Sequence, residues 1–296
     1  VGATSGESHD RPDLSLDAGM DDLIAAVASC ANNTIVLAQI PGAVVMPWRD
    51  SVEGILAMFL GGQETGSAWA DVLFGDHAPT GRLPIMIPAT EADTIEPSSA
   101  LSIVYSEGMA TSYRNTSFQA AFPFGHGLTY TVFEYLEPAT AAPCPDSTGP
   151  ALLCVHARIR NAGPAAARAL PQLYLELPPV AGHPTPLLKG FQKTGVLVPG
   201  ADTEVVFRLT GRDLSYYDAT AGAWVLAVGP ATAHIGESSA DLRLVVQLEI
   251  PTSTTTTGTT TTGTTTQGIA LSSGRRHRRL SVLLLGLAVL VGVAGM

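Results

Sequence analysis

The chain has 296 residues, of which 46% are hydrophobic and 14% are charged. This composition excludes a disordered protein and provides a sizeable core, in two domains plus additional segments. The formal net charge of −10 argues against nucleic acid as a partner, because phosphate contacts need clustered Lys and Arg, and the only basic cluster is 275–279. A neutral or weakly charged ligand fits better.

The start of the chain predicts alternating strands and helices. Residues 1–4 read as the end of a buried strand that runs into a loop, residues 20–30 as a helix and residues 34–38 as a second buried strand. Strands that alternate with helices imply a parallel sheet. Because the chain has no initiating Met and begins within such a strand, we expect it to be truncated.

A strand, a glycine turn and a helix are predicted next. Residues 54–60 are apolar throughout, as expected of a strand that is covered on both faces. In residues 63–74 the apolar positions recur at helical spacing, and Gly75 has the position of a left-handed C-cap. The segment therefore predicts a strand-to-helix unit of an α/β layer. The residues that set the helical spacing are Ala70, Leu73 and Phe74.

Beyond Pro97 the pattern changes to short candidate strands that are separated by Gly and Pro. Their number and spacing suggest a β-sandwich that follows the α/β part. The candidate strands are residues 154–159, 173–177, 204–209 and 224–228.

The three cysteines make an odd count. Cys144 and Cys154 are close enough in sequence to form a disulfide across a loop, which would leave Cys30 unpaired. Cys30 follows apolar residues on the predicted helix. It is either a small buried hydrophobic residue or the partner of a cysteine in a missing segment.

The C-terminal part predicts a stalk and a membrane attachment. Residues 251–267 are almost only Thr and Gly, a composition that cannot bury a core and is typical of an extended, O-glycosylated stalk. The basic cluster precedes an uncharged apolar run, 280–296, at the short edge of the roughly 17 to 25 residues that span a bilayer. Small residues at 272–274 also fit a GPI-attachment signal, so both kinds of anchor stay open.

Several features bear on the side of the membrane. The stalk and two N-glycosylation sequons, at 32–34 and 115–117, favour the extracellular or lumenal side. The basic cluster favours the opposite orientation, but large domains are translocated largely regardless of charge. We therefore expect a membrane-anchored glycoprotein that is extracellular or lumenal.

Three motifs stand in the order found in one known family. They are Ser-Gly-Glu-Ser-His-Asp-Arg at 5–11, the glycine turn and helix that close with Pro-Thr-Gly-Arg-Leu-Pro at 61–84, and Pro-Phe-Gly-His-Gly-Leu-Thr-Tyr at 123–130. Together they resemble family 3 glycoside hydrolases, the β-glucosidase and β-xylosidase group, over about residues 1–247. Three separated motifs in one order are far more specific than any single one.

The resemblance and the residue pattern give the same architecture. The expected fold class is α/β, with a partial α/β sandwich layer followed by a fibronectin type III-like β-sandwich, whose sequence residues 188–193 and 236–244 resemble. The expected domains are a C-terminal α/β domain of a family 3 glycosidase, N-terminally truncated, at 1–95; a connecting segment at 96–135; the fibronectin type III-like domain at 136–250; the Thr-rich stalk at 251–274; and the basic cluster with its hydrophobic anchor or GPI signal at 275–296.

Glu7 is the candidate catalytic residue. Glycoside hydrolysis needs one ionised carboxyl group beside the sugar carbon and one protonated group that gives a proton to the leaving oxygen. Glu7 lies in a Gly- and Ser-rich loop directly after a strand end, where the backbone can approach a ligand. The resemblance implies an acid/base role, because that Glu in family 3 enzymes often lies in a Ser-Gly-Glu loop; the alternative is an ordinary solvated Glu. The sequence departs from the commoner form at Ser8, where many relatives have Gly.

Other charged residues receive structural interpretations. Asp10 and Arg11 are expected to pair and fix the loop. Glu64 lies at the start of the predicted helix, where negative charge is favoured by the helix dipole. Glu107, in a Tyr-Ser-Glu-Gly motif that leads to Tyr113, is expected to belong to the packing between domains; the alternative is that the motif lines the mouth of the site.

The histidines predict no metal site. His9, His77 and His126 are scattered without metal-ligand spacing, and the sequence has no Cys or His cluster. His126 stands between two glycines in a turn that we expect to join the α/β layer to the sandwich, which is a structural role. We expect neither a metal nor a cofactor.

The resemblance implies an exo-acting, retaining β-glucosidase-like hydrolase of terminal β-glycosidic bonds, with a β-glucoside or oligosaccharide as substrate. In that family the nucleophile is an Asp on a (β/α)₈ barrel that precedes the sandwich domain, and no residues here correspond to that barrel. We therefore expect the C-terminal part of a larger enzyme, which contributes Glu7 and is inactive alone. Two alternatives are a non-catalytic, surface-anchored glycan-binding or adhesion module and a structural stalk protein.

Overall fold

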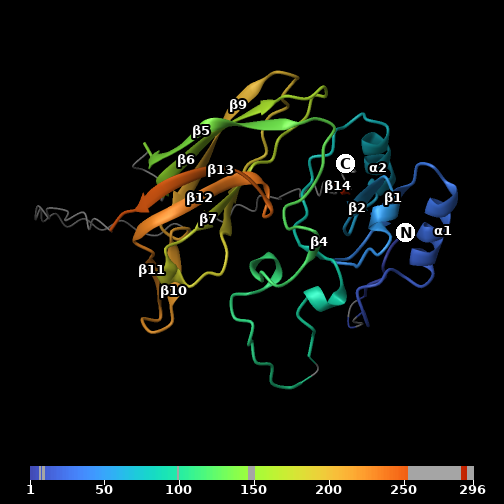
Figure 1. The fold of residues 1–296 in the computed structure, drawn as a ribbon, viewed down its shortest axis with the longest axis horizontal. Helices are drawn as coiled ribbons and strands as arrows, with labels where there is room; N and C mark the ends of the chain where they lie inside the picture. The colour runs from blue at the N-terminus through green and yellow to red at the C-terminus, as the bar shows by residue number, and fades with distance from the viewer. Residues whose placement is uncertain (7, 9–10, 99, 146–150, 253–287, 292–296) are drawn as a thin grey trace, which may run out of the picture.

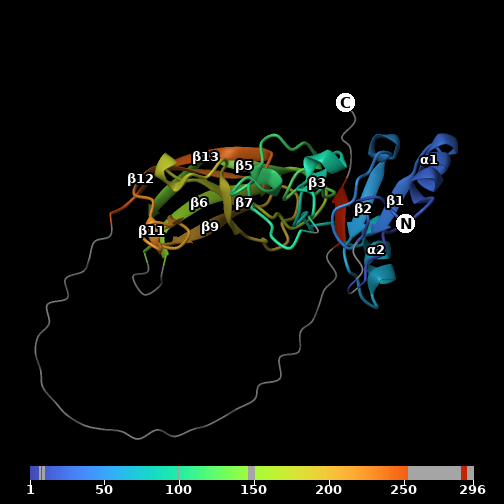
Figure 2. The same cartoon turned by 90° about the horizontal axis from the view of Figure 1, so that it is seen from below.

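The computed structural model describes residues 1–6, 8, 11–98, 100–145, 151–252 and 288–291. An α/β unit lies at one end of the molecule and a β-sandwich at the other (Figures 1 and 2). Two short antiparallel strands, β3 (Ile87–Pro88) and β4 (Ala120–Phe122), belong to the segment between them. The predicted fold class is confirmed.

Two parallel strands form the centre of the α/β unit. β1 (Ile35–Gln39) pairs with β2 (Gly54–Met58), and Gly2 makes a parallel bridge to Gln39 on the other side of β1. β2 is buried at every position, as predicted for a strand covered on both faces. β1 alternates between exposed and buried positions, and Ile35 is 53% exposed. The prediction of a buried strand is therefore wrong for one face of β1, which is open to solvent.

Two helices accompany this sheet. α1 (Met20–Cys30) has the predicted bounds, and α2 (Thr65–Leu73) lies within the predicted range. Gly75 has a φ of 84°, which confirms the left-handed conformation expected after the helix. The apolar face predicted for α2 is wrong, because the helix buries Val72 while Phe74 is 83% exposed.

Short 3₁₀ helices lie in the connections between the strands and helices. They are η1 (Arg49–Ser51), η2 (Glu91–Asp93), η3 (Ser112–Arg114) and η4 (Pro179–Ala181).

The core of the α/β unit consists of apolar residues from both strands, from α1 and β4, and from the loops that follow the strands. The core includes Ile24, Val36, Ala38, Ile40, Val44, Met46, Trp48, Ile55, Leu83 and Phe122.

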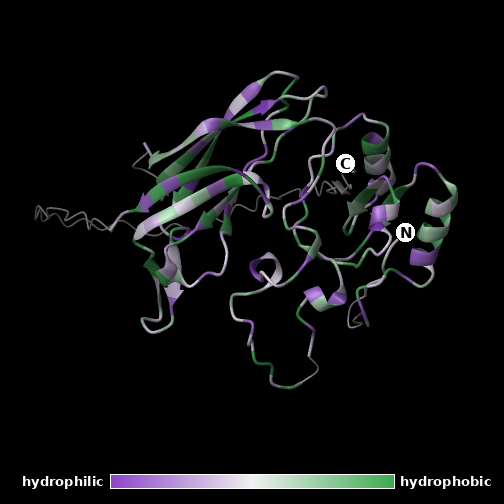
Figure 3. Ribbon diagram, in the orientation of Figure 1, coloured by the Kyte–Doolittle hydropathy of each residue, from purple (hydrophilic) through white to green (hydrophobic). Residues whose placement is uncertain are grey.

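The sandwich packs a four-stranded sheet, in the order β13-β12-β7-β8, on a three-stranded sheet, in the order β5-β6-β9. Hydrophobic and hydrophilic residues alternate along its strands (Figure 3), as expected when one face of each sheet meets the core. All four predicted strand segments lie in or overlap strands of this unit. Its strands are β5 (Phe133–Pro143), β6 (Ala151–Asn161), β7 (Gln172–Glu176), β8 (Leu187–Phe191), β9 (Asp202–Thr210), β12 (Gly229–Ser238) and β13 (Asp241–Ile250), with a separate hairpin of β10 (Ser215–Asp218) and β11 (Ala223–Leu226).

The predicted disulfide is confirmed. Cys144 and Cys154 are bonded with an S–S distance of 2.10 Å, which ties the chain after β5 to β6. Cys30 is free and exposed. Its interpretation as a buried hydrophobic residue is wrong, because α1 turns the face of Ile24, not that of Cys30, toward the core.

The C-terminal apolar run lies mostly outside the described residues. Within it, β14 (Ala288–Val291) pairs antiparallel with β2, with Val289 opposite Ala57. In the described part of the chain, no helix is long and apolar enough to cross a membrane. The membrane anchor therefore stays a prediction.

Candidate functional site

The loop predicted to carry the acid/base lies at the carboxyl edge of the parallel strands. Gly2 enters this edge beside Gln39, and the loop follows it directly. Ligands of open parallel sheets bind outside the carboxyl ends of the strands. Glu7 itself lies outside the described residues. At this edge a small cavity of about 360 Å³ is lined by Val1, Gly2, Ala3, Thr4, Ser5, Asp17, Gln39, Ile40, Pro41 and Leu60.

The two ends of the loop are joined by a set of hydrogen bonds. The Thr4 backbone N–H donates to Asp17 Oδ1 at 2.8 Å, and the Thr4 hydroxyl donates to Asp17 Oδ2 at 2.6 Å. The Asp17 N–H donates to the Gly2 carbonyl at 3.0 Å. The Thr4 hydrogen bonds stabilise the ionised carboxylate, so they lower the pKa of Asp17. The base of the loop is thus fixed relative to the sheet.

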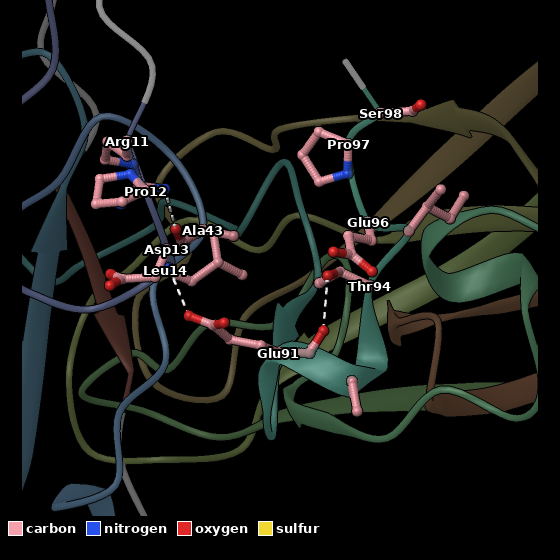
Figure 4. Close-up of a pocket in the computed structure, with 12 residues that line it drawn as sticks. Arg11, Pro12, Asp13, Leu14, Ala43, Glu91, Thr94, Glu96, Pro97 and Ser98 are labelled. Atoms are coloured by element: carbon pink, nitrogen blue, oxygen red, sulfur yellow. Dashed lines mark hydrogen bonds between the residues drawn. The ribbon is translucent and has the colours of Figure 1, made fainter. Parts of the chain in front are cut away.

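Two further hydrogen bonds hold the far side of the loop (Figure 4). The Arg11 guanidinium donates to the Ala43 carbonyl at 2.7 Å, and the Leu14 N–H donates to Glu91 Oε1 at 2.7 Å. Asp10 lies outside the described residues, so its predicted pairing with Arg11 stays a prediction. Arg11 was expected to fix the loop, and it holds its end of the loop through this hydrogen bond to Ala43.

A cavity of about 1060 Å³ opens beside this part of the loop (Figure 4). Glu91 uses its carboxylate to hold Leu14, and Asp13 accepts from the Ser15 N–H at 2.9 Å. Both carboxylates hold backbone N–H groups, and no sequence motif indicated Asp13 or Glu91. The lining is Arg11, Pro12, Asp13, Leu14, Ala43, Glu91, Ala92, Thr94, Ile95, Glu96, Pro97 and Ser98.

The residue that departs from the commoner family motif has a conformation suited to glycine. Ser8 has a φ of 62°, in the left-handed region that disfavours a side chain. We expect Ser8→Gly to raise the free energy of unfolding by up to about 1 kcal/mol, because glycine adopts this conformation without strain. Urea unfolding of both proteins measures the difference. Ser15→Gly in the same loop is the control and should not stabilise; a Ser8→Gly protein of lower stability would contradict the expectation.

Two other predicted residues lie away from this loop. Glu64 is the N-cap residue of α2 and is exposed, as expected of a carboxylate favoured by the helix dipole. Glu107 is half-buried, but Tyr105 beside it is 80% exposed. The prediction that this motif packs between domains is therefore wrong for Tyr105.

Tyr113 does pack between the two units. Its ring stacks on Phe124 at a centroid distance of 4.7 Å and meets the edge of Tyr174 of β7 at 6.1 Å. Its hydroxyl accepts a hydrogen bond from the Leu188 N–H at 3.2 Å. The end of the predicted motif thus provides one of the interdomain contacts.

A largely buried ion pair connects two of the sequence motifs across the units. The Arg82 side chain, 9% exposed, donates to Glu237 Oε2 at 3.0 Å and also to the Gly127 carbonyl, and the Glu237 side chain is 16% exposed. Arg243 lies 3.1 Å from the other oxygen of Glu237. Glu237 is therefore held between two guanidinium groups, one from each side of the junction.

His126 lies in the turn that joins the units, as predicted. Gly125 before it has a φ of 81°, and the His126 ring stacks on Phe122 at 5.7 Å. Burial, with the charge of Arg82, lowers the pKa of His126. These contacts support a structural role. Among the described residues, no group of three or more His, Cys, Asp or Glu could hold a metal ion.

Comparison with known families agrees with this architecture. The model of the glycosyl hydrolase family 3 C-terminal domain matches residues 1–130, and the model of the fibronectin type III-like domain matches residues 169–239. The chain belongs to glycosyl hydrolase family 3. All three motifs that carry the resemblance lie within residues 1–130, so the resemblance stated from the sequence is confirmed.

Similar family 3 proteins are β-glucosidases. One from Rhizobium radiobacter is 34% identical over 83% of this chain and 31% of its own length, and probable beta-glucosidase D of Aspergillus niger is 33% identical over 86% and 36%. The solved β-glucosidase D2-BGL of Chaetomella raphigera has a TM-score of 0.78 and 31% identity, over 85% of this chain and 39% of its own. DesR, a β-glucosidase from Streptomyces venezuelae in complex with D-glucose, has a TM-score of 0.75 and 34% identity, over 84% and 33%. The chain spans about a third of the length of the curated relatives it matches.

Proposed function

We propose that this chain is part of an enzyme that hydrolyses terminal β-glucosidic bonds with retention of configuration, and that Glu7 is its acid/base. One observation carries the proposal: the Ser-Gly-Glu loop of a family 3 chain follows the Gly2 bridge at the carboxyl edge of the parallel strands. The similar β-glucosidases support the substrate class.

The proposed mechanism has two steps. A carboxylate attacks the anomeric carbon and forms a glycosyl-enzyme, while Glu7 gives its proton to the leaving oxygen. Glu7 then accepts a proton from the water that releases the sugar. The two carboxyl groups of a retaining enzyme stand about 5 Å apart. We propose that the nucleophile comes from a part of the enzyme outside these 296 residues, since the relatives are about three times as long.

The hydrogen bonds at the base of the loop have a clear role in this proposal. General acid catalysis requires the carboxyl group to stay within hydrogen-bonding reach of the leaving oxygen. The Asp17 bonds to Thr4 and the Glu91 bond to Leu14 fix the chain on both sides of Glu7. These hydrogen bonds hold the described residues that flank Glu7, which is the support that the proposed acid/base role requires.

The test uses the native protein, captured with an antibody against residues 136–250. We expect it to be larger than 30.7 kDa and to cleave p-nitrophenyl β-D-glucoside, with β-D-glucose as the first product seen by NMR. The β-D-xyloside in the same assay tests the sugar, and a mock capture without antibody is the control. Hydrolysis of neither glycoside, with binding of oligosaccharide retained, would overturn the proposal in favour of a glycan-binding module.

We also propose that the protein is extracellular or lumenal and is anchored by its C-terminal apolar run. The Thr-rich stalk and the two sequons support this orientation. Treatment of intact cells with a GPI-specific phospholipase should release the protein if the anchor is GPI, whereas a transmembrane anchor requires detergent. Recovery in the wash fraction without either treatment would contradict the anchor.

A further inference from the structure

The hairpin of β10 and β11 carries two exposed aromatic side chains on one face. Tyr217 of β10 stands directly opposite Trp224 of β11, and the rings meet edge to face at a centroid distance of 5.6 Å. Tyr217 is 54% exposed and Trp224 is 47% exposed. Because the hairpin pairs with neither sheet of the sandwich (Figure 1), both rings remain at the surface. Contiguous exposed apolar surface is a feature of ligand-binding sites, so this pair is a candidate for one.

A guanidinium group with free donors lies against the same pair. The Arg212 guanidinium carbon is 3.2 Å from the centroid of the Trp224 ring. This cation–π contact fixes the position of the guanidinium group over the ring. Among the described residues, no acceptor forms a hydrogen bond or ion pair with Arg212. The N–H donors of its guanidinium group are therefore available to a ligand. Adjacent hydroxyl groups or a carboxylate on that ligand would match their geometry.

Neighbouring groups complete a mixed polar surface. Lys189 of β8 is half-buried and, within the described part of the chain, has no ion pair; burial, with the charge of Arg212 nearby, lowers its pKa. Asp213 accepts from the Thr210 N–H at 2.9 Å and Asp218 accepts from the Thr220 N–H at 2.8 Å. Lys189 thus lies near Arg212 and Asp213, and Asp218 follows Tyr217 in β10, so the cations and carboxylates near the hairpin are equal in number.

We propose that the face formed by Tyr217, Trp224 and Arg212 binds a neutral oligosaccharide of pyranoses, at a site separate from the loop at residues 5–16. Arg212 covers one face of the Trp224 ring, and the exposed parts of Tyr217 and Trp224 offer apolar ring surface that matches the C–H face of a pyranose, while the free donors of Arg212 match its adjacent hydroxyl groups. The balanced local charge and the net charge of −10 disfavour a polyanion. The site does not depend on the proposed hydrolysis, because binding is measured directly.

The probe is a cellotetraose with sulfur in its glycosidic linkages, which glycosidases do not cleave, and calorimetry measures its affinity for the full chain. We expect Trp224→Ala to weaken binding at least about tenfold and Arg212→Gln to weaken it by roughly three- to tenfold. Phe191→Ala, which removes an aromatic residue that is 68% exposed on β8, and Arg160→Gln, which removes the same charge from β6, are matched controls. Both controls should bind within twofold of the unchanged protein.

A second probe tests the chemical class of the ligand. The same tetramer with its C6 positions oxidised to carboxylates should bind more weakly than the neutral one. Equal binding by Trp224→Ala, with thermal unfolding unchanged, would overturn the proposal. Preference for the oxidised tetramer would overturn its neutral character. Failure of the unchanged chain to bind, with a concentration-dependent dimer that Trp224→Ala abolishes, would assign the face to a second copy instead.

Discussion

Replacement of Arg82 by Met should lower the free energy of unfolding by about 3 kcal/mol. Loss of one partner from a buried ion pair costs about 3–5 kcal/mol because the remaining charge stays buried without compensation. The lower end applies here because the Glu237 side chain is 16% exposed and Arg243 still pairs with it at 3.1 Å. The Gly127 carbonyl also loses its donor. Urea unfolding of the full chain, followed by Trp fluorescence, measures the change.

The matched control is Arg158→Met on β6. Arg158 pairs with Asp202, but its side chain is 65% exposed, and exposed pairs contribute at most about 1 kcal/mol. Adding Glu237→Gln to the Arg82→Met variant should restore part of the loss, since a neutral amide then replaces a largely desolvated carboxylate that has kept only one of its two guanidinium partners. If Arg82→Met lowers the free energy of unfolding by no more than Arg158→Met does, this ion pair does not hold the two units together.

Replacement of Gly125 by Ala should cost about 2–4 kcal/mol. The φ of 81° at this position strains any residue with a side chain. A β-carbon there would also collide with the side-chain oxygens of Gln172 and Tyr174. Gln172 cannot move freely, because its amide donates to the Gly125 carbonyl at 2.9 Å and accepts from the Tyr174 hydroxyl at 2.6 Å. Overpacking of such a buried site adds about 1–3 kcal/mol to the backbone strain.

Gly66→Ala in α2 gives a control of opposite sign. A β-carbon at Gly66 meets no atom within 4 Å, and alanine is favoured over glycine in a helix by roughly 0.5–1 kcal/mol. Gly66→Ala should therefore raise the midpoint of thermal unfolding while Gly125→Ala lowers it. Equal midpoints for the two variants would mean that the turn at Gly125 relaxes around the added methyl group.

The strands and the first helix could be predicted because local signals specify them. α1 has its acidic first turn and apolar spacing within one segment, and β2 is apolar at every position. The buried face of α2 could not be read in this way, because Val72 and Leu73 are both apolar and only tertiary contacts decide which one is covered. The exposure of Cys30 could not be predicted for the same reason, since α1 buries only a narrow face, on which Ile24 lies.

The motif of the candidate site could be predicted from the sequence, but the contacts that hold its loop in place could not. The Ser-Gly-Glu string indicated the loop, and the strand end before it indicated the edge of the sheet. The contacts that fix the loop join residues far apart in sequence: Leu14 and Glu91 are 77 positions apart, and Thr4 and Asp17 are 13 apart. Arg82 and Glu237 both belong to family motifs in the sequence, but they are 155 positions apart, and no local sequence pattern indicated that they form an ion pair.

The role of Glu7 is the central claim, and its dependence on the leaving group tests it most directly. In the complete native protein, Glu7→Ala should slow cellobiose hydrolysis by about 10²–10⁴-fold, because its leaving alcohol needs a proton. The same change should slow 2,4-dinitrophenyl β-D-glucoside far less, since that leaving group departs without protonation. An equal loss for both substrates, in a protein that unfolds at the unchanged temperature, would contradict the assignment of Glu7 as the acid/base.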